Sequence, residues 1–226
     1  MANRKTVLAT GEYYHVFNRG VARQPAFLTQ NDYEQVVLDM VYYRVRKPPV
    51  RLSRFKEQPK EVREKLLKEI YQEKDCLVDV VAYVFMPNHF HLLLQQSVDK
   101  GISTFVSRFT NSYTKYFNTK RNRVGPIFQG VFKSVHIESN EQLLHLSRYI
   151  HLNPVTSFVV EEKNLFSYRW SSLPEYLSGD ERVNGLATDA VLGQFASTEK
   201  YKEFLEDRVE HRKQLEGIKH LLIEVN

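Results

Sequence analysis

The sequence predicts an α+β fold: a ferredoxin-like (split βαβ) antiparallel sheet with helices on one face, followed by a helical C-terminal tail. Its composition is that of a globular protein, with 226 residues, 42% hydrophobic and 26% charged. Two strand-like runs flank Met86-Pro87-Asn88, which predicts a hairpin. The expected elements follow the order strand, helix, strand, strand, helix, strand, helix, which is the split βαβ pattern.

The first half of this order rests on three segments. Residues 13–18 are aromatic and β-branched and end at Asn18-Arg19-Gly20, which predicts a strand and a turn. Asn31 or Asp32 can cap a helix whose apolar residues recur at helical spacing up to residue 45, before two prolines. Residues 51–75 are highly charged, and we expect a surface insertion with one short amphipathic helix.

The second half begins with the hairpin and alternates helix and strand. A break at Gly125-Pro126 separates the helix after the hairpin from the next strand. We expect the last helix to end at Asn153-Pro154, because proline disfavours a helical conformation in the residue before it. Beyond that point lies an amphipathic stretch at residues 199–222. The expected ranges are 77–85 and 90–95 for the hairpin, 102–118 for the helix, 130–137 for the strand and 141–152 for the last helix.

These elements predict one domain at residues 10–158 and a C-terminal extension at residues 159–226. A sheet with helices on one face would leave its other face free for a ligand or a nucleic acid strand. No run approaches the roughly 18 apolar residues of a membrane span, and residues 1–11 lack the apolar core of a secretory signal. We therefore expect a cytoplasmic protein with no membrane partner. The single cysteine, Cys76, excludes an internal disulfide and a multi-cysteine metal site.

The charge distribution points to a polyanionic partner. The net charge is +5, and the segment from Gly101 to Ile137 holds six basic residues and no acidic ones. Aromatic residues lie among these cations, which suits phosphate contact and base stacking, although helical spacing also predicts that the aromatics face the core. The basic residues are Arg108, Lys115, Lys120, Arg121, Arg123 and Lys133.

The sharpest local pattern is His89-Phe90-His91 at the start of a predicted strand. Residues two apart in a strand lie on one face, about 6 to 7 Å apart, so two imidazoles can converge on one cation. Phe90 would then point into the core. The pattern supports half of a metal site, and two plain surface histidines are the alternative.

Tyr149 and Asn153 lie four residues apart on the last predicted helix and so share one helical face. An asparagine oxygen can bind a metal, and a tyrosine hydroxyl near a cation is a competent nucleophile. A structural tyrosine and a helix-capping asparagine are the alternative interpretation. Tyr113 and Tyr116 are rival nucleophiles on a basic helix, but neither is followed by a metal-type residue at the same spacing.

Five ordered segments resemble the REP-associated tyrosine transposases, which are relatives of single-tyrosine insertion-sequence transposases. The resemblance runs from about residue 13 to residue 176. Val131, where many relatives have an arginine, and the insertion at residues 51–75 depart from the family's pattern. The five segments are Tyr14-His15-Val16-Phe17-Asn18-Arg19-Gly20, Met86-Pro87-Asn88-His89-Phe90-His91-Leu92-Leu93-Leu94, Gly125-Pro126-Ile127-Phe128-Gln129-Gly130, Arg148-Tyr149-Ile150-His151-Leu152-Asn153-Pro154-Val155 and Tyr168-Arg169-Trp170-Ser171-Ser172.

The resemblance implies an HUH nuclease domain in which His89, His91 and Asn153 hold Mg²⁺ or Mn²⁺ and Tyr149 is the nucleophile. It implies cleavage and transfer of single-stranded DNA at palindromic REP hairpins through a 5′-phosphotyrosine. The six basic residues would then contact DNA. It also implies a bacterial, nucleoid-associated protein that acts as a monomer or a homodimer.

Two other functions remain open from the sequence. A ferredoxin-like sheet could bind structured DNA or RNA without cutting it. A metallohydrolase could use the two histidines with water as nucleophile, but no third ligand is evident nearby.

Overall fold

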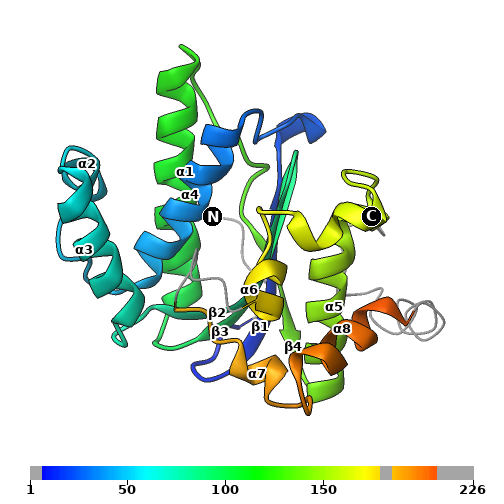
Figure 1. Cartoon of the computed structure of the whole chain (residues 1–226). Helices are drawn as coiled ribbons and strands as arrows, with labels where there is room; N and C mark the ends of the chain where they lie inside the picture. The colour runs from blue at the N-terminus through cyan, green and yellow to red at the C-terminus, as the bar shows by residue number, and fades with distance from the viewer. Residues whose placement is uncertain (1–6, 179–184, 208–226) are drawn as a thin grey trace.

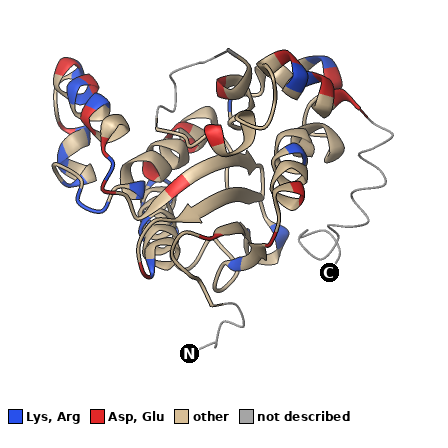
Figure 2. Cartoon of the chain, turned by 90° about the horizontal axis from the view of Figure 1, so that it is seen from below, with Lys and Arg blue, Asp and Glu red and all other residues tan. Residues whose placement is uncertain are grey.

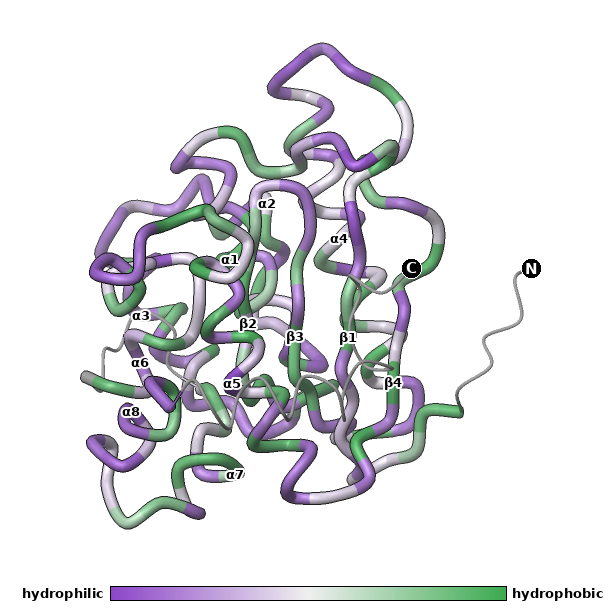
Figure 3. Tube along the Cα trace, turned by 90° about the vertical axis from the view of Figure 1, so that its right-hand side faces the viewer, coloured by the Kyte–Doolittle hydropathy of each residue, from purple (hydrophilic) through white to green (hydrophobic). Residues whose placement is uncertain are grey.

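The computed structural model describes residues 7–178 and 185–207, and these contain a four-stranded antiparallel sheet in the order β2-β3-β1-β4 (Figures 1 and 3). The predicted α+β antiparallel fold is confirmed. The predicted hairpin is β2 and β3, joined at Pro87 and Asn88. β4 begins three residues later than the sequence suggested. The strand bounds are Tyr13–Arg19 for β1, Val78–Met86 for β2, His89–Gln96 for β3 and Lys133–Ile137 for β4.

Two helices, α1 (Gln30–Arg44) and α4 (Gly101–Lys120), cover the first face of the sheet. Phe90 points to this side, and its ring lies edge-on to Phe109 of α4 with centroids 5.3 Å apart. α1 begins after Thr29, whose side chain caps the helix together with Asp32 in a capping box. Asp32 is therefore the third residue of the helix, whereas the sequence suggested it as the cap.

The second face is covered by α5 (Asn140–Thr156), so the expectation of helices on one face is corrected (Figure 1). The reason lies in β2, whose residues are apolar on both sides: Val80 and Tyr83 join the first cluster, and Val81 and Val84 join the second. A strand without alternation of apolar and polar residues needs cover on both faces.

The chain after α5 packs onto the same second face. Ser171 forms a β-bridge with Val84, and the hydroxyl of Tyr176 donates to the carbonyl of Val81 at 2.8 Å. The described part of the predicted extension therefore shares its core with α5 and β2. Residues 208–222 of the predicted amphipathic stretch lie outside the described residues. The helices here are η2 (Glu162–Ser167), α6 (Leu173–Ser178), α7 (Asp189–Leu192) and α8 (Thr198–Glu206).

α5 does not end at Asn153-Pro154 as expected but continues to Thr156. Proline costs a helix one N–H donor and clashes with the preceding turn, and it is costly in the middle of a helix. Pro154 lies in the final turn, where Ser157 closes the helix by donating its N–H to the carbonyl of Asn153 at 2.9 Å. Asn153 consequently lies within the helix and faces inward.

The charged insertion forms two helices, of which the sequence predicted one. They are α2 (Leu52–Lys56) and α3 (Lys60–Gln72), and they stand apart from the sheet with basic and acidic residues interleaved (Figures 1 and 2). A short turn, η1 (Val21–Arg23), follows β1. None of the helices in the described ranges is both long and apolar enough to cross a membrane.

Asp39, a fully buried residue of α1, gives a prediction about stability. Burial raises its pKa to about 6, although hydrogen bonds from Gln35 and Ser112 and the charge of Lys56 oppose the shift. A carboxyl whose pKa is higher in the folded state stabilises the fold below its unfolded pKa of about 3.9, and this contribution is lost as pH rises through about 6. Asp39→Asn should therefore be more stable than the wild type at pH 8, by about 1–3 kcal/mol.

Urea unfolding at pH 4 and pH 8 measures this difference. At pH 4 the two proteins should be much closer in stability, because Asp39 is then largely protonated in the fold. An equal difference at both pH values would contradict the assignment.

Candidate active site and nucleic-acid surface

The alternation of β3 puts His89 and His91 on the second face of the sheet, beneath α5, with Phe90 on the first face. The two imidazole rings lie 5.0 Å apart between centroids and nearly perpendicular, at 85°. This is the same-face arrangement that the i, i+2 spacing predicts. Both are largely buried; His91 has no exposed surface.

α5 brings Tyr149 and Asn153 onto the same histidines. The Tyr149 ring meets the His91 ring edge-on, with centroids 5.3 Å apart. Asn153 is fully buried and lies close enough to His89 to affect its pKa. The four residues that the sequence singled out thus come together from β3 and α5.

Two further residues orient the histidines, and the sequence analysis did not single them out. Asn88 Oδ1 lies 2.7 Å from His89 Nδ1 and accepts a hydrogen bond from its N–H. His15 Nε2 lies 2.8 Å from His91 Nδ1, with the rings stacked at 5.0 Å. When His91 donates to His15, His89 and His91 are both Nδ1–H tautomers, and each carries its lone pair on Nε2. Strand register could have pointed to His15, because Phe17 pairs with His91 and His15 lies two residues earlier on the same face.

Burial keeps both histidines neutral at physiological pH. It lowers the pKa of His89 to about 4, with Asn153 opposing the shift. It lowers the pKa of His91 well below its usual value, and the neighbouring His15, His89 and Arg19 add to the effect. Neutral imidazole is the form that binds metals. The Nε2 atoms of His89 and His91 are buried, and neither makes a hydrogen bond of standard geometry with the described residues.

The two Nε2 atoms of His89 and His91 supply only two ligands for a divalent cation, and the side-chain oxygen of Asn153 would supply a third. Among the described residues no three His, Cys, Asp or Glu side chains are grouped to hold a metal. The donor set is two imidazole nitrogens and an amide oxygen. This set suits Mn²⁺ better than Ca²⁺, because Ca²⁺ prefers oxygen ligands.

The structure separates the six predicted DNA-contacting cations. Arg108 and Lys115 are exposed on α4, and neither forms an ion pair with a described residue. Lys133 is exposed at the start of β4, beside Phe17 of the candidate site. Arg123 instead hydrogen-bonds to Asn118 and to a backbone carbonyl.

Lys120 and Arg121 bind a buried carboxylate. Lys120 Nζ lies 3.1 Å from Asp32 Oδ1, and Arg121 Nη2 lies 2.5 Å from Asp32 Oδ2. Burial alone would raise the pKa of Asp32, but hydrogen bonds from Arg121, Leu28 and Lys120 hold it well below its usual range. These two cations therefore contribute to the fold.

Most aromatic residues of the basic segment belong to the core rather than to a stacking surface. Phe105, Phe109 and Phe117 are buried between α4 and the sheet. Tyr113 is buried on the first face, where its hydroxyl donates to the carbonyl of Ala26 at 2.6 Å. The hydroxyl of Tyr116 contacts Asp32 and Lys120. Of the three tyrosines, Tyr149 is therefore the one that packs against His91.

A family model described as "Transposase IS200 like" matches residues 36–153, from within α1 to Asn153. The chain belongs to the IS200-like transposase family. The solved structure of a REP-associated tyrosine transposase bound to a REP hairpin resembles this transposase with a TM-score of 0.55 and 15% sequence identity, covering 81% of this chain and 90% of that one. This likeness supports the fold. No curated protein matches the transposase.

The two kinds of cation on α4 should respond differently to removal. Arg121→Ala leaves buried Asp32 with one partner fewer, so the transposase should lose about 2 kcal/mol, less than the roughly 3–5 kcal/mol of a fully broken buried pair because Lys120 remains. Arg108→Ala removes an exposed side chain and should change stability by no more than about 0.5 kcal/mol. Urea unfolding of the two variants compares them, and equal losses would refute the distinction.

Proposed function

We propose that this transposase is a metal-dependent endonuclease and strand transferase that cleaves single-stranded DNA beside a hairpin and forms a 5′-phosphotyrosine at Tyr149. The observation that carries the proposal is the packing of Tyr149 against His91, with Asn153 beside His89. A pure binding protein would need none of these four side chains together. The hairpin substrate is proposed by analogy with the similar structure, which is bound to a REP hairpin.

His89, His91 and Asn153 would hold Mg²⁺ or Mn²⁺. Two features support this: the histidines are neutral, and their Nε2 atoms are buried without a hydrogen bond of standard geometry in the described chain. When bound, the cation would offset the negative charge on the non-bridging oxygens of the scissile phosphate. Asn88 and His15 would keep the two imidazoles in the tautomer that presents Nε2.

Tyr149 would act as the covalent nucleophile. Its hydroxyl oxygen gives up its proton and attacks phosphorus as the bond to the 3′ oxygen breaks, and the 3′ oxygen takes up a proton and leaves as a free hydroxyl. The phosphodiester is exchanged for a phosphotyrosine diester, so no bond energy is lost to water. A 3′-hydroxyl from the same or another strand can attack that diester in the reverse sense, which joins the strands and restores the tyrosine.

Cations on the protein surface suit a DNA substrate. Lys133 lies beside Phe17, next to the candidate site, and Arg108 and Lys115 are exposed without ion pairs to described residues. Contacts of lysine and arginine with phosphates release counterions, so binding should weaken steeply as salt concentration rises.

Tyr149→Phe tests the covalent step. The ring remains to pack against His91, so the fold and DNA affinity should be nearly unchanged, while the protein–DNA adduct disappears. Denaturing gel electrophoresis with end-labelled hairpin oligonucleotides and Mn²⁺ or EDTA measures the adduct. Tyr113→Phe is the matched control and should still form adduct, since Tyr113 lies on the other face of the sheet.

Adduct in Tyr149→Phe would overturn the nucleophile. If the wild type binds DNA tightly but forms no adduct with any divalent metal, the transposase fold serves only for binding, and the binding-protein alternative is the correct one.

His15 gives a prediction about metal affinity. His15→Phe removes the acceptor for His91 Nδ1–H, and loss of such an outer hydrogen bond typically weakens metal binding by about 10–100-fold. His15→Gln supplies an amide oxygen in a similar position and should retain most of the affinity. Electron paramagnetic resonance of free Mn²⁺ during titration measures binding without any activity. Equal affinities of the two variants would mean that His15 does not orient His91.

A further inference from the structure

A large groove lies on the first-face side of the molecule, away from the candidate active site. It runs between α4 on one wall and the end of α1 with the start of the insertion on the other. Its volume of about 1190 Å³ exceeds the roughly 300–1,000 Å³ of small-molecule pockets, so it suits an extended ligand. No residue of the catalytic set lines it.

The lining of the groove is basic and has no acidic residue. Arg46 pairs with Asp75 at 3.5 Å, and Lys120 is held by Asp32. Arg51, Arg108 and Lys115 form no ion pair within the described chain, so three cations from two walls are available to a ligand. The six basic residues are Arg46, Arg51, Lys56, Arg108, Lys115 and Lys120.

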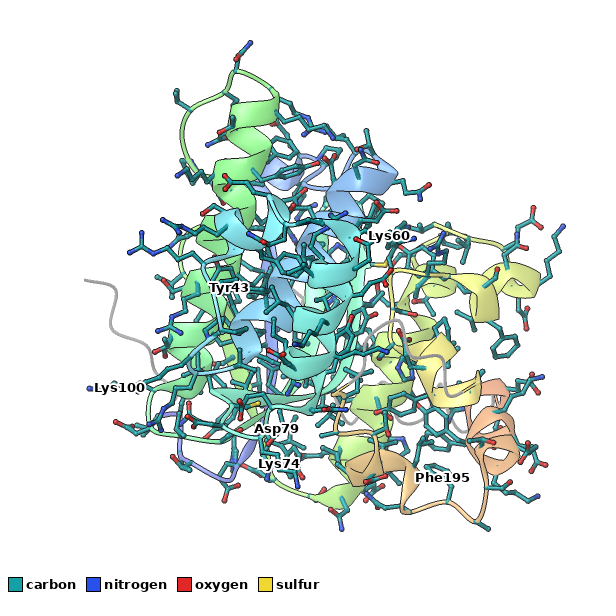
Figure 4. The ribbon with its side chains drawn as sticks, turned by 60° about the vertical axis from the view of Figure 1, so that its left-hand side comes forward. Tyr43, Lys60, Lys74, Asp79, Lys100 and Phe195 are labelled. Carbon is teal, nitrogen blue, oxygen red and sulfur yellow. The ribbon has the colours of Figure 1, made fainter. Side chains whose placement is uncertain are left out.

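Between these cations the groove offers apolar surface. Pro48, Pro49 and Val50 line it, together with Tyr43 at the end of α1 (labelled in Figure 4). A single nucleic acid strand presents both phosphates and unstacked base faces, and such a surface accommodates both. A duplex keeps its base faces stacked inside and would use only the cations.

Two smaller hollows lie in series beyond this groove, and each shares lining residues with the next. Ser107 and Asn111 of α4 line both the groove and a hollow of about 350 Å³. Asn18 and Val131 line that hollow and a third one of about 540 Å³, which reaches Phe17. The Phe17 ring lies 5.9 Å from the His91 ring. The three hollows are therefore neighbours along the surface between the groove and Phe17.

We propose that the groove binds a single-stranded DNA segment that flanks the cleavage site, and that the insertion serves as one of its walls. The proposal rests on the proposed function for its choice of DNA as the polyanion. It assigns a role to Arg51, at the start of the charged insertion. It also gives a role to Arg108 and Lys115, which are exposed and form no ion pair with a described residue.

The double variant Arg51→Ala/Lys115→Ala removes one free cation from each wall. Fluorescence anisotropy in EDTA measures its affinity for labelled oligo(dT) of about 8 and about 16 nucleotides, the upper range of a single-strand module. For the wild type, affinity should rise with length. The double variant should bind the longer strand about 10-fold more weakly at 0.1 M salt, and its salt slope should fall by about 1.4, from two lost phosphate contacts at roughly 0.7 each.

Lys65→Ala/Lys68→Ala is the matched control, because it removes two exposed cations of α3 that do not line the groove. It should bind like the wild type. The charge-conserving Arg51→Lys/Lys115→Arg should restore most of the affinity. For a blunt DNA hairpin without single-stranded flanks, the affinities of the Arg51→Ala/Lys115→Ala and Lys65→Ala/Lys68→Ala variants should differ much less than they do for oligo(dT).

Equal losses of oligo(dT) affinity in the two double-alanine variants would overturn the groove proposal, because only the net charge of the protein would then matter. A loss on the blunt hairpin as large as that on oligo(dT) would assign the groove to duplex DNA instead. The adduct assay separates this inference from the proposed function. If the wild type forms adduct but the groove variant binds oligo(dT) normally, the groove inference fails alone. If the groove variant loses oligo(dT) binding and no protein forms adduct, the catalytic proposal fails alone.

Discussion

The packing of α5 over the second face of the sheet is the constraint on which the candidate site depends. β3 points Phe90 to α4 and its two histidines to α5, so a single strand supplies both a core contact and the site. Because α5 buries them, His89 and His91 stay neutral. The same helix places Tyr149 against His91. Burial of an unpaired polar atom costs about 1–3 kcal/mol, and the apolar clusters on both faces supply the compensating stability.

Much of this could be predicted from local sequence, and the rest depends on long-range packing. Spacing placed His89 with His91 and Tyr149 with Asn153, because strand and helix periods are local properties. Their meeting depends on how α5 lies on the sheet, which spacing does not encode. The continuous apolar run of β2 could have predicted that the second face of the sheet is covered. The continuation of α5 beyond Pro154 could not be predicted, because the cost of a proline depends on which turn of the helix it occupies.

The basic segment shows why composition overstates a binding surface. No acidic residue lies near Lys120 or Arg121 in the sequence, yet Asp32, almost ninety positions earlier, neutralises much of their charge. Helical periodicity correctly indicated that aromatics such as Phe105 and Phe109 belong to the core. What remains available from this segment is a smaller set of exposed cations, Arg108, Lys115 and Lys133. Only the fold brings the first two onto one groove with Arg51 of the insertion.

β1 carries two residues, His15 and Phe17, that contact the His91 ring. It pairs with β3, so its residues are fixed relative to His91 by main-chain hydrogen bonds. His15 orients the His91 ring, while Phe17, two residues along the same face, contacts that ring and also lines one of the surface hollows. A DNA strand lying against Phe17 would contact the same side chain that packs beside His91. The strand that positions the His91 imidazole thus also lines the hollow at Phe17, so β1 is common to the candidate site and to the proposed DNA surface.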